Sequence, residues 1–175
     1  MVRFKNRYLL GHVEFGDNAV DESISQRDIF FALKASIQYN FGLFGEGLLG
    51  NGLQVKYYNG ITGQLIVRCA RDTHRLVWSA LTSITKLRSR QATVSVLHVG
   101  GSLRTCQQAA IKYNKALIAR LLRGGDGGRG GAGVGVGVGA GAAAASGGAG
   151  ESGAAAKRVV AASERAMDEV LALKA

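Results

Sequence analysis

Three basic residues lie at alternate positions near the start of the chain: Arg3, Lys5 and Arg7. In an extended strand, alternate side chains point to the same face about 7 Å apart, a separation comparable to that of phosphates along a nucleic acid strand. Cations in such a row repel one another unless a polyanion neutralises them. The pattern therefore favours contact with nucleic acid phosphates. The alternative is an edge strand whose charges prevent aggregation.

Further cations surround the starts of two expected helices. Arg71 and Arg75 lie at the start of one helix, and Arg104 follows Gly100-Gly101-Ser102 at the start of another. Backbone N–H groups at a helix start attract anions, although Ser102 acting as an ordinary N-cap is an alternative reading of this triplet. We predict that phosphate contacts come from seven residues: Arg3, Lys5, Arg7, Arg68, Arg71, Arg75 and Arg104.

The net positive charge is confined to the first part of the chain. The 175 residues carry a formal net charge of +10; residues 1–123 contain 17 Lys/Arg and 7 Asp/Glu, whereas residues 124–175 contain 5 of each. Residues 124–153 include 15 glycines, and because glycine at this density is costly to order, we predict a flexible linker. Residues 154–175 regain apolar residues about one turn apart, which predicts a short amphipathic helix or, alternatively, a frayed tail.

Residue types that support enzyme chemistry are sparse. The GEGLLG stretch (residues 45–50) matches a dinucleotide fingerprint, but it follows an expected helix and precedes an expected strand, which is the wrong context. Cys69 and His74 could form a nucleophile pair, although a buried strand end and an exposed first helical turn are the commoner settings for such residues. The two cysteines and three histidines do not have the spacing of zinc ligands. No catalytic residue and no metal ligand is therefore predicted.

Cysteine content and hydropathy indicate the kind of compartment in which the protein is expected. Cys69 and Cys106 are too few for a disulfide framework and fit a reducing compartment. No run of about 18 apolar residues lacks both charge and dense glycine, so we expect no membrane span.

The basic segment alternates between strand and helix periodicities. We expect strands over residues 3–15, 53–58, 64–69 and 93–99, and helices over residues 25–39, 72–87 and 103–121. Ser25 and Asp28 form a relative of the capping box at the first helix. Asp72 or Thr73 can cap the second, and we expect Asp72 to do so. The order β-α-β-β-α-β-α is that of a ferredoxin-like or RNA-recognition-like two-layer α+β sandwich with an extra helix, here assigned to residues 1–123.

A glycine-rich loop is expected between the first helix and the second strand, over residues 40–52. It carries four apolar residues that are too hydrophobic for solvent, so they either fold onto the core or bind another subunit: Leu43, Phe44, Leu48 and Leu49. Tyr57, Tyr58 and Tyr113 could stack on bases, but the strand at residues 64–69 has no aromatic residue. We therefore expect contacts to phosphate and sugar rather than sequence readout by a bare sheet.

Four long blocks of the chain resemble one known family. The blocks are MVRFKNRYLL (residues 1–10), VKYYNGITGQLIVRCARD (55–72), VWSALTSIT (77–85) and VLHVGGSLRTCQQAAIKYN (96–114). They are similar to the small processing-of-precursors subunit, number five, shared by eukaryotic ribonuclease P and ribonuclease MRP, which has archaeal relatives. The resemblance covers about residues 1–122, whereas the glycine-rich segment and the last helix have no counterpart in it.

The resemblance implies an RNA-recognition-like sandwich that binds RNA without catalysing a reaction. In this family the partner RNA, with Mg²⁺, removes the 5′ leader of precursor tRNA in ribonuclease P and processes precursor rRNA in ribonuclease MRP. The chain itself is expected to bind no cofactor. Its implied partners are that RNA, a TIM-barrel-like protein subunit and a paralogous small subunit, in the nucleus and nucleolus. The basic residues within the matching blocks, including Arg3, Lys5 and Arg7, would face the RNA.

Three other readings remain open at this point. A ribosomal or other RNA-associated protein with the same sandwich would share the basic surface. An acylphosphatase-like enzyme would use Asn6 and Arg7, but the stretch after the first strand, GDNAVDE (residues 16–22), is acidic and would repel phosphate. A ligand-sensing regulatory module of ferredoxin-like shape is the third.

Overall fold

The computed structural model describes residues 5–17, 23–123 and 151–173. The elements, in chain order, are β1 (Asn6–Phe15), α1 (Gln26–Leu49), the short 3-10 helix η1 (Gly50–Gly52), β2 (Gln54–Asn59), β3 (Gln64–Ala70), α2 (His74–Thr82), β4 (Lys86–Leu87), β5 (Arg90–Gly100), α3 (Leu103–Arg123) and α4 (Glu151–Ala172). The predicted α+β order is confirmed, with β4 added before the last long strand and α4 at the end.

The sheet has five strands in the order β2-β3-β1-β5-β4. Every neighbouring pair is antiparallel, and β1 lies at the centre between β3 and β5. In this register Tyr8 of β1 lies opposite Arg68 on one side and opposite Gly100 on the other. Without the two-residue β4, the strand order is that of a ferredoxin-like sandwich.

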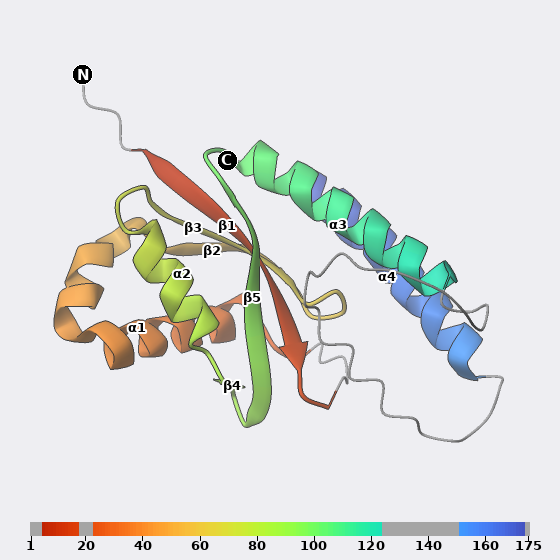
Figure 1. Ribbon diagram of the computed structural model, residues 1–175, viewed down its shortest axis with the longest axis horizontal. Helices are drawn as coiled ribbons and strands as arrows, with labels where there is room; N and C mark the ends of the chain where they lie inside the picture. The colour runs from red at the N-terminus through yellow and green to blue at the C-terminus, as the bar shows by residue number, and fades with distance from the viewer. Residues whose placement is uncertain (1–4, 18–22, 124–150, 174–175) are drawn as a thin grey trace, which may run out of the picture.

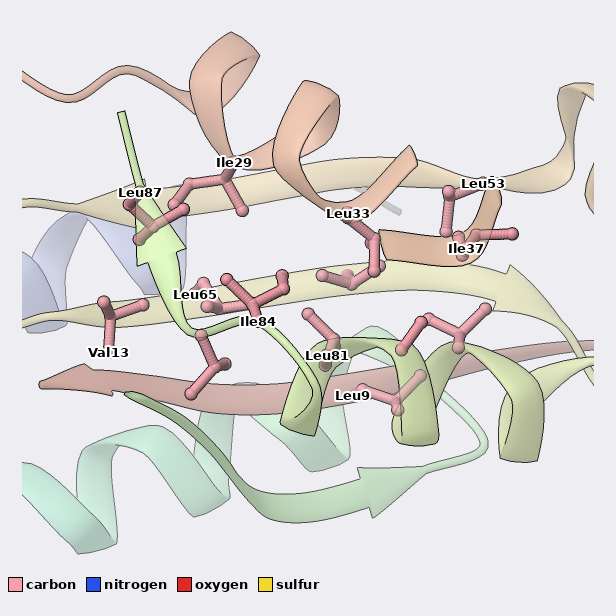
Figure 2. Packing of buried hydrophobic residues seen from close by; sticks show 14 of the residues in the cluster. Leu9, Val13, Ile29, Leu33, Ile37, Leu53, Leu65, Leu81, Ile84 and Leu87 are labelled. Carbon is pink, nitrogen blue, oxygen red and sulfur yellow. The ribbon is translucent and has the colours of Figure 1, made fainter. Parts of the chain in front are cut away.

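Helices cover both faces of the sheet (Figure 1). On one face, alternate residues of β1 and β3 such as Leu9, Val13 and Leu65 pack with α1 and α2, as Figure 2 shows for Leu33 and Leu81. On the other face α3 and α4 lie over a second cluster made of Tyr8, Leu10, Tyr57, Ile66, Leu103, Cys106, Ala110 and Val170. Each fully buried Leu or Ile contributes about 1.5–3 kcal/mol of transfer free energy, so both faces help to hold the central strands.

Helix α1 begins as the sequence predicts. Ser25 Oγ accepts a hydrogen bond from the Asp28 backbone N–H at 3.4 Å, and Asp28 Oδ2 accepts one from the Ser25 backbone N–H at 2.8 Å. This reciprocal capping box satisfies two donors that a helix start otherwise leaves open. The stripe Ile29, Leu33 and Ile37 is fully buried.

The predicted loop at residues 40–52 is wrong, because α1 continues to Leu49. The helix changes direction at Gly42, whose φ of 62° is a left-handed conformation that favours glycine. An ion pair of 2.8 Å between Lys34 and Glu46 joins the two halves of the helix. Tertiary packing of Leu49 outweighs the low helix propensity of the glycines here.

Helix α2 is shorter than predicted. It ends at Thr82 rather than near Leu87, and Leu87 instead belongs to β4, which the sequence analysis missed. Ile84 and Leu87 are nevertheless buried, because the chain turns back along the sheet while keeping both side chains on the core. The preferred cap, Asp72, is wrong, because the alternative Thr73 occupies the N-cap position, although its side chain makes no capping hydrogen bond.

The C-terminal segment contains a helix. Residues 154–172 are helical as expected, within α4, which starts at Glu151. Most of the predicted linker and Arg3 lie outside the described residues. Among the described residues no helix is long and apolar enough to cross a membrane.

Candidate nucleic-acid interface

Six of the seven predicted cations lie at one end of the sheet. This basic end is formed where β1 begins, β3 and β5 end, and α2 and α3 begin. The strand register places Arg7 opposite Cys69 in β3, and the Arg71 backbone N–H donates to the Lys5 carbonyl at 2.8 Å. The six are Lys5, Arg7, Arg68, Arg71, Arg75 and Arg104. The fold therefore brings residues that are far apart in the sequence to one surface. Their spacing in the sequence did not predict this grouping.

Arg7 connects β1 to the start of α3. A side-chain methyl built at Gly101 would lie 3.1 Å from Arg7 Nη1, so this guanidinium lies against the turn before α3. Glycine at 101 keeps that approach open. Arg104, in the first turn of α3, is exposed, and both side chains therefore lie next to the positive end of the α3 helix dipole.

The two ends of the sheet differ in whether their cations form ion pairs. Within the described part of the chain, no ion pair involves any of the six cations of the basic end. At the opposite end Arg88 pairs with Asp28 at 3.0 Å and Arg90 pairs with Asp17. Arg90 also lies 4.5 Å from the centre of the Phe15 ring. The unneutralised positive field is therefore concentrated at the basic end.

The Gly100-Gly101-Ser102 turn serves mainly as a helix cap. Ser102 Oγ accepts a hydrogen bond from the Thr105 backbone N–H at 3.3 Å, and Thr105 Oγ1 donates to the Ser102 carbonyl at 2.7 Å. A Cβ at Gly100 would clash with Thr105 Oγ1, so this position requires glycine. The capping alternative accounts for the triplet without a bound anion.

The tyrosines do not form an open stacking platform. Tyr57 is 4% exposed beneath α4, and its hydroxyl donates to the Ala166 carbonyl at 3.4 Å. Burial raises the pKa of Tyr57 above its ordinary range, so its hydroxyl keeps its proton. The Tyr113 ring lies 5.6 Å from that of His12, centre to centre. This sheet face is therefore covered by α3 and α4 in the structure.

The four residues of the predicted apolar partner surface differ in exposure. Leu43, Phe44 and Leu48 are 78%, 75% and 50% exposed, whereas Leu49 is 7% exposed and belongs to the core. Including Leu49 in a partner surface is wrong, because the kink at Gly42 turns it inward. Trp78 of α2 is also 42% exposed. The spacing of apolar residues gave no means of separating these exposed members from buried ones.

The cysteines and histidines form no reactive site. Burial raises the pKa of the Cys69 thiol to about 12 and that of Cys106 to about 11, so neither is a thiolate at neutral pH. Cys69 Sγ contacts the Arg7 carbonyl, and His74 Nδ1 lies 2.6 Å from the Arg71 carbonyl, so the two are not paired. Within the described ranges, no three His, Cys, Asp or Glu residues are grouped as metal ligands.

Comparison with known proteins gives consistent matches. Residues 7–111 match the family model described as the Rpp14/Pop5 family. The "Ribonuclease P/MRP protein subunit POP5" of Bos taurus is 38% identical over 127 residues, which cover 70% of this chain and 75% of the relative. The Homo sapiens subunit of the same name is 37% identical, covering 70% and 78%. The "Probable ribonuclease P/MRP protein subunit POP5" of Arabidopsis thaliana is 36% identical over 121 residues, covering 66% and 80%.

Proposed function

Since this chain belongs to the Rpp14/Pop5 family, we propose that it is a noncatalytic, RNA-binding subunit of ribonuclease P and ribonuclease MRP. The observation that carries the RNA-binding role is the basic end of the sheet, where six cations lie together without carboxylate partners among the described residues. Catalysis belongs to the RNA, with Mg²⁺, in removal of the precursor tRNA leader and in precursor rRNA processing.

The basic end is suited to binding the closely packed phosphates of a compact RNA fold rather than to recognising a particular base sequence. Phosphates packed around an RNA active site repel one another, and fixed guanidinium groups offset that repulsion. Arginine keeps its charge at any physiological pH. The basic end does carry one exposed carboxylate next to Arg71, that of Asp72, but the six cations outnumber it and cations do not coordinate the Mg²⁺ that the RNA needs.

Protein partners would bind elsewhere on the molecule. Leu43, Phe44 and Leu48 expose apolar side chains on the second half of α1, and such a surface is typical of a subunit interface. We propose that it contacts a TIM-barrel-like subunit or a paralogous small subunit of the same particle, in the nucleus and nucleolus. Replacing all three residues by serine should abolish copurification of that subunit without changing the melting temperature, because none of the three is in the core. Unchanged copurification would reject this interface.

RNA binding is tested with matched pairs of cations. Arg71 and Arg104 are exposed at the basic end, whereas Arg27 and Lys86 are exposed near the Asp28–Arg88 ion pair at the opposite end. Arg71→Ala with Arg104→Ala should weaken binding to the cognate ribonuclease P RNA and reduce the slope of log K against log salt by about 1 per cation. Arg27→Ala with Lys86→Ala removes the same charge and should change much less. Equal losses in the two double variants would show that net charge alone is responsible.

The role in RNA folding is tested by Mg²⁺ titration. Particles reconstituted without this subunit should need more Mg²⁺ for full precursor tRNA cleavage, and the Arg71→Ala, Arg104→Ala variant should lie between. An unchanged Mg²⁺ requirement in both preparations would contradict charge neutralisation as its contribution.

A further inference from the structure

Helix α4 lies along α3 over the sheet face that carries Tyr8, Tyr57 and Ile66 (Figure 1). The two helices run in opposite directions, so the end of α4 lies beside the start of α3. Gln107 Nε2 donates to the last carbonyls of α4, at 2.6 Å to Val170 and 3.2 Å to Leu173. At the other side of the helix, Glu169 accepts from the Tyr57 hydroxyl at 3.3 Å and from Asn59 at 3.4 Å.

In the part of α4 whose side chains the structure describes, residues 161–172, the buried side chains are mostly small. These buried residues are Ala162, Ser163, Ala166 and Val170, and Leu173 just beyond the helix packs partly buried against the same cluster. Ser163 Oγ is buried without a hydrogen-bond partner. Burying little apolar area and leaving a hydroxyl unsatisfied both weaken the docking of this helix.

The covered face also includes one of the predicted RNA-binding residues. Arg68 points to the same side of β3 as Ile66 and lies opposite Tyr8, whose carbonyl accepts from Cys106 Sγ in the first turns of α3. Arg68 is therefore at the level where Gln107 holds the end of α4. Its Nε is buried and has no hydrogen-bond partner, which is costly for a charged donor. An incoming acceptor, such as a phosphate oxygen, would satisfy this group.

We propose that α4 is a displaceable autoinhibitory helix, and that a single-stranded segment of RNA replaces it on the face formed by Tyr8, Tyr57 and Arg68. A phosphate would accept from the Arg68 guanidinium, and the tyrosine rings would stack on bases. This proposal rests on the RNA-binding function proposed above. It gives the C-terminal segment, which lies beyond the family match at residues 7–111, a role in setting RNA affinity.

The test compares two substitutions on the full chain. Val170→Asp places a charge in the buried contact and should release α4, whereas Leu171→Asp adds the same charge at a neighbouring residue that is 60% exposed. The probe is a fluorescently labelled 12-nucleotide oligouridine, and affinity is measured by anisotropy. Relative to Leu171→Asp, Val170→Asp should bind at least about fivefold more tightly, the lower end of typical coupling between sites. Adding Arg68→Ala should remove that gain.

Two further measurements keep the result interpretable. Gln107→Ala removes both hydrogen bonds to the end of α4 without burying a charge, and it should raise affinity in the same direction if Val170→Asp proves too unstable to purify. Circular dichroism and hydrogen exchange of residues 161–173 establish that α4 alone is released. No gain in affinity on release, a gain that persists with Arg68→Ala, or a gain seen only for a protein subunit would each overturn the proposal.

The same experiment separates the two levels of inference. If Arg71→Ala with Arg104→Ala weakens binding to the ribonuclease P RNA but release of α4 does not tighten oligouridine binding, the RNA-binding function stands and the autoinhibitory helix is rejected. If neither the parent chain nor the released variant binds either RNA, both proposals fail.

Discussion

Gln64 of β3 and Asn114 of α3 form a reciprocal amide pair in the interior of the protein. Gln64 Nε2 donates to Asn114 Oδ1 at 2.7 Å, and Asn114 Nδ2 donates to Gln64 Oε1 at 3.3 Å. Both residues are fully buried. Because each amide satisfies the other, the pair fixes the rotation of α3 over the sheet more specifically than apolar contacts alone.

Replacing one member of this pair should cost more than replacing both. Asn114→Ala leaves the Gln64 amide buried without a partner, so we expect the free energy of unfolding to fall by about 1–3 kcal/mol. Gln64→Leu combined with Asn114→Leu should lose less, since no buried amide is then left unpaired. Urea denaturation measures the parent chain and both variants, with the exposed Gln108→Ala of the same helix as control. A double variant that loses more stability than Asn114→Ala would argue against a coupled pair.

Two glycines should respond to alanine with opposite signs. Gly63 has a φ of 65°, and a Cβ there would clash with the Val13 carbonyl. Gly63→Ala should therefore lower the free energy of unfolding by about 2 kcal/mol or more. Gly47 lies in α1 with no atom within 4 Å of its Cβ position, so Gly47→Ala should raise stability by about 0.5–1 kcal/mol. Thermal denaturation of the two variants compares them directly, and a loss at Gly47 would show that the second half of α1 needs glycine for another reason.

Stability should fall as the pH is lowered through the range where histidine titrates. Burial lowers the pKa of His12, and this outweighs the opposing effects of Glu14 and of the Gly63 backbone. The unfolded chain therefore binds a proton at His12 before the folded protein does, so stability is present above the ordinary pKa near 6.5 and declines below it. The slope from this one residue is at most about 1.4 kcal/mol per pH unit.

The measurement is urea denaturation at pH 7.5, 6.5 and 5.5. His12→Gln should flatten the decline over this range, whereas His98→Gln, at an exposed position of β5, should leave it unchanged. A variant lacking His12 that keeps the full pH dependence would assign the effect to another group.

The capping box should contribute measurably to α1. Ser25→Ala removes the acceptor for the Asp28 backbone N–H, and we expect a loss of about 1 kcal/mol. Hydrogen bonds from Ser25, reinforced by Arg88, lower the pKa of Asp28. The contribution of the Asp28 carboxylate to stability is therefore present above the ordinary pKa of a carboxyl group and is lost only in strong acid. Acid titration of unfolding therefore distinguishes this effect from that of His12, and Gln26→Ala in the same turn is the control.

Local patterns in the sequence were sufficient for most elements. The alternation in β1, the Ser25–Asp28 cap and the stripe Ile29, Leu33 and Ile37 each depend on residues close in the chain, and all three are present in the structure. The resemblance carried by four blocks gave the family, which the comparisons confirmed. Excess positive charge before Gly124 was equally a property of the sequence alone.

Other features depended on contacts between distant segments. Leu48 and Leu49 are neighbours of the same type, yet only Leu49 reaches the core, because the direction of the chain after Gly42 decides which one faces inward. Arg68 and Arg104 lie at the same end of the sheet because β1 pairs with β3 on one side and, on the other, with β5, which leads into α3. The sequence by itself determined the periodicities, the caps, the charge and the family, since these are set by local sterics and composition. Tertiary structure alone decided which apolar residues stay exposed and that α4 covers Tyr57, because burial depends on which surfaces remain when the whole chain has packed.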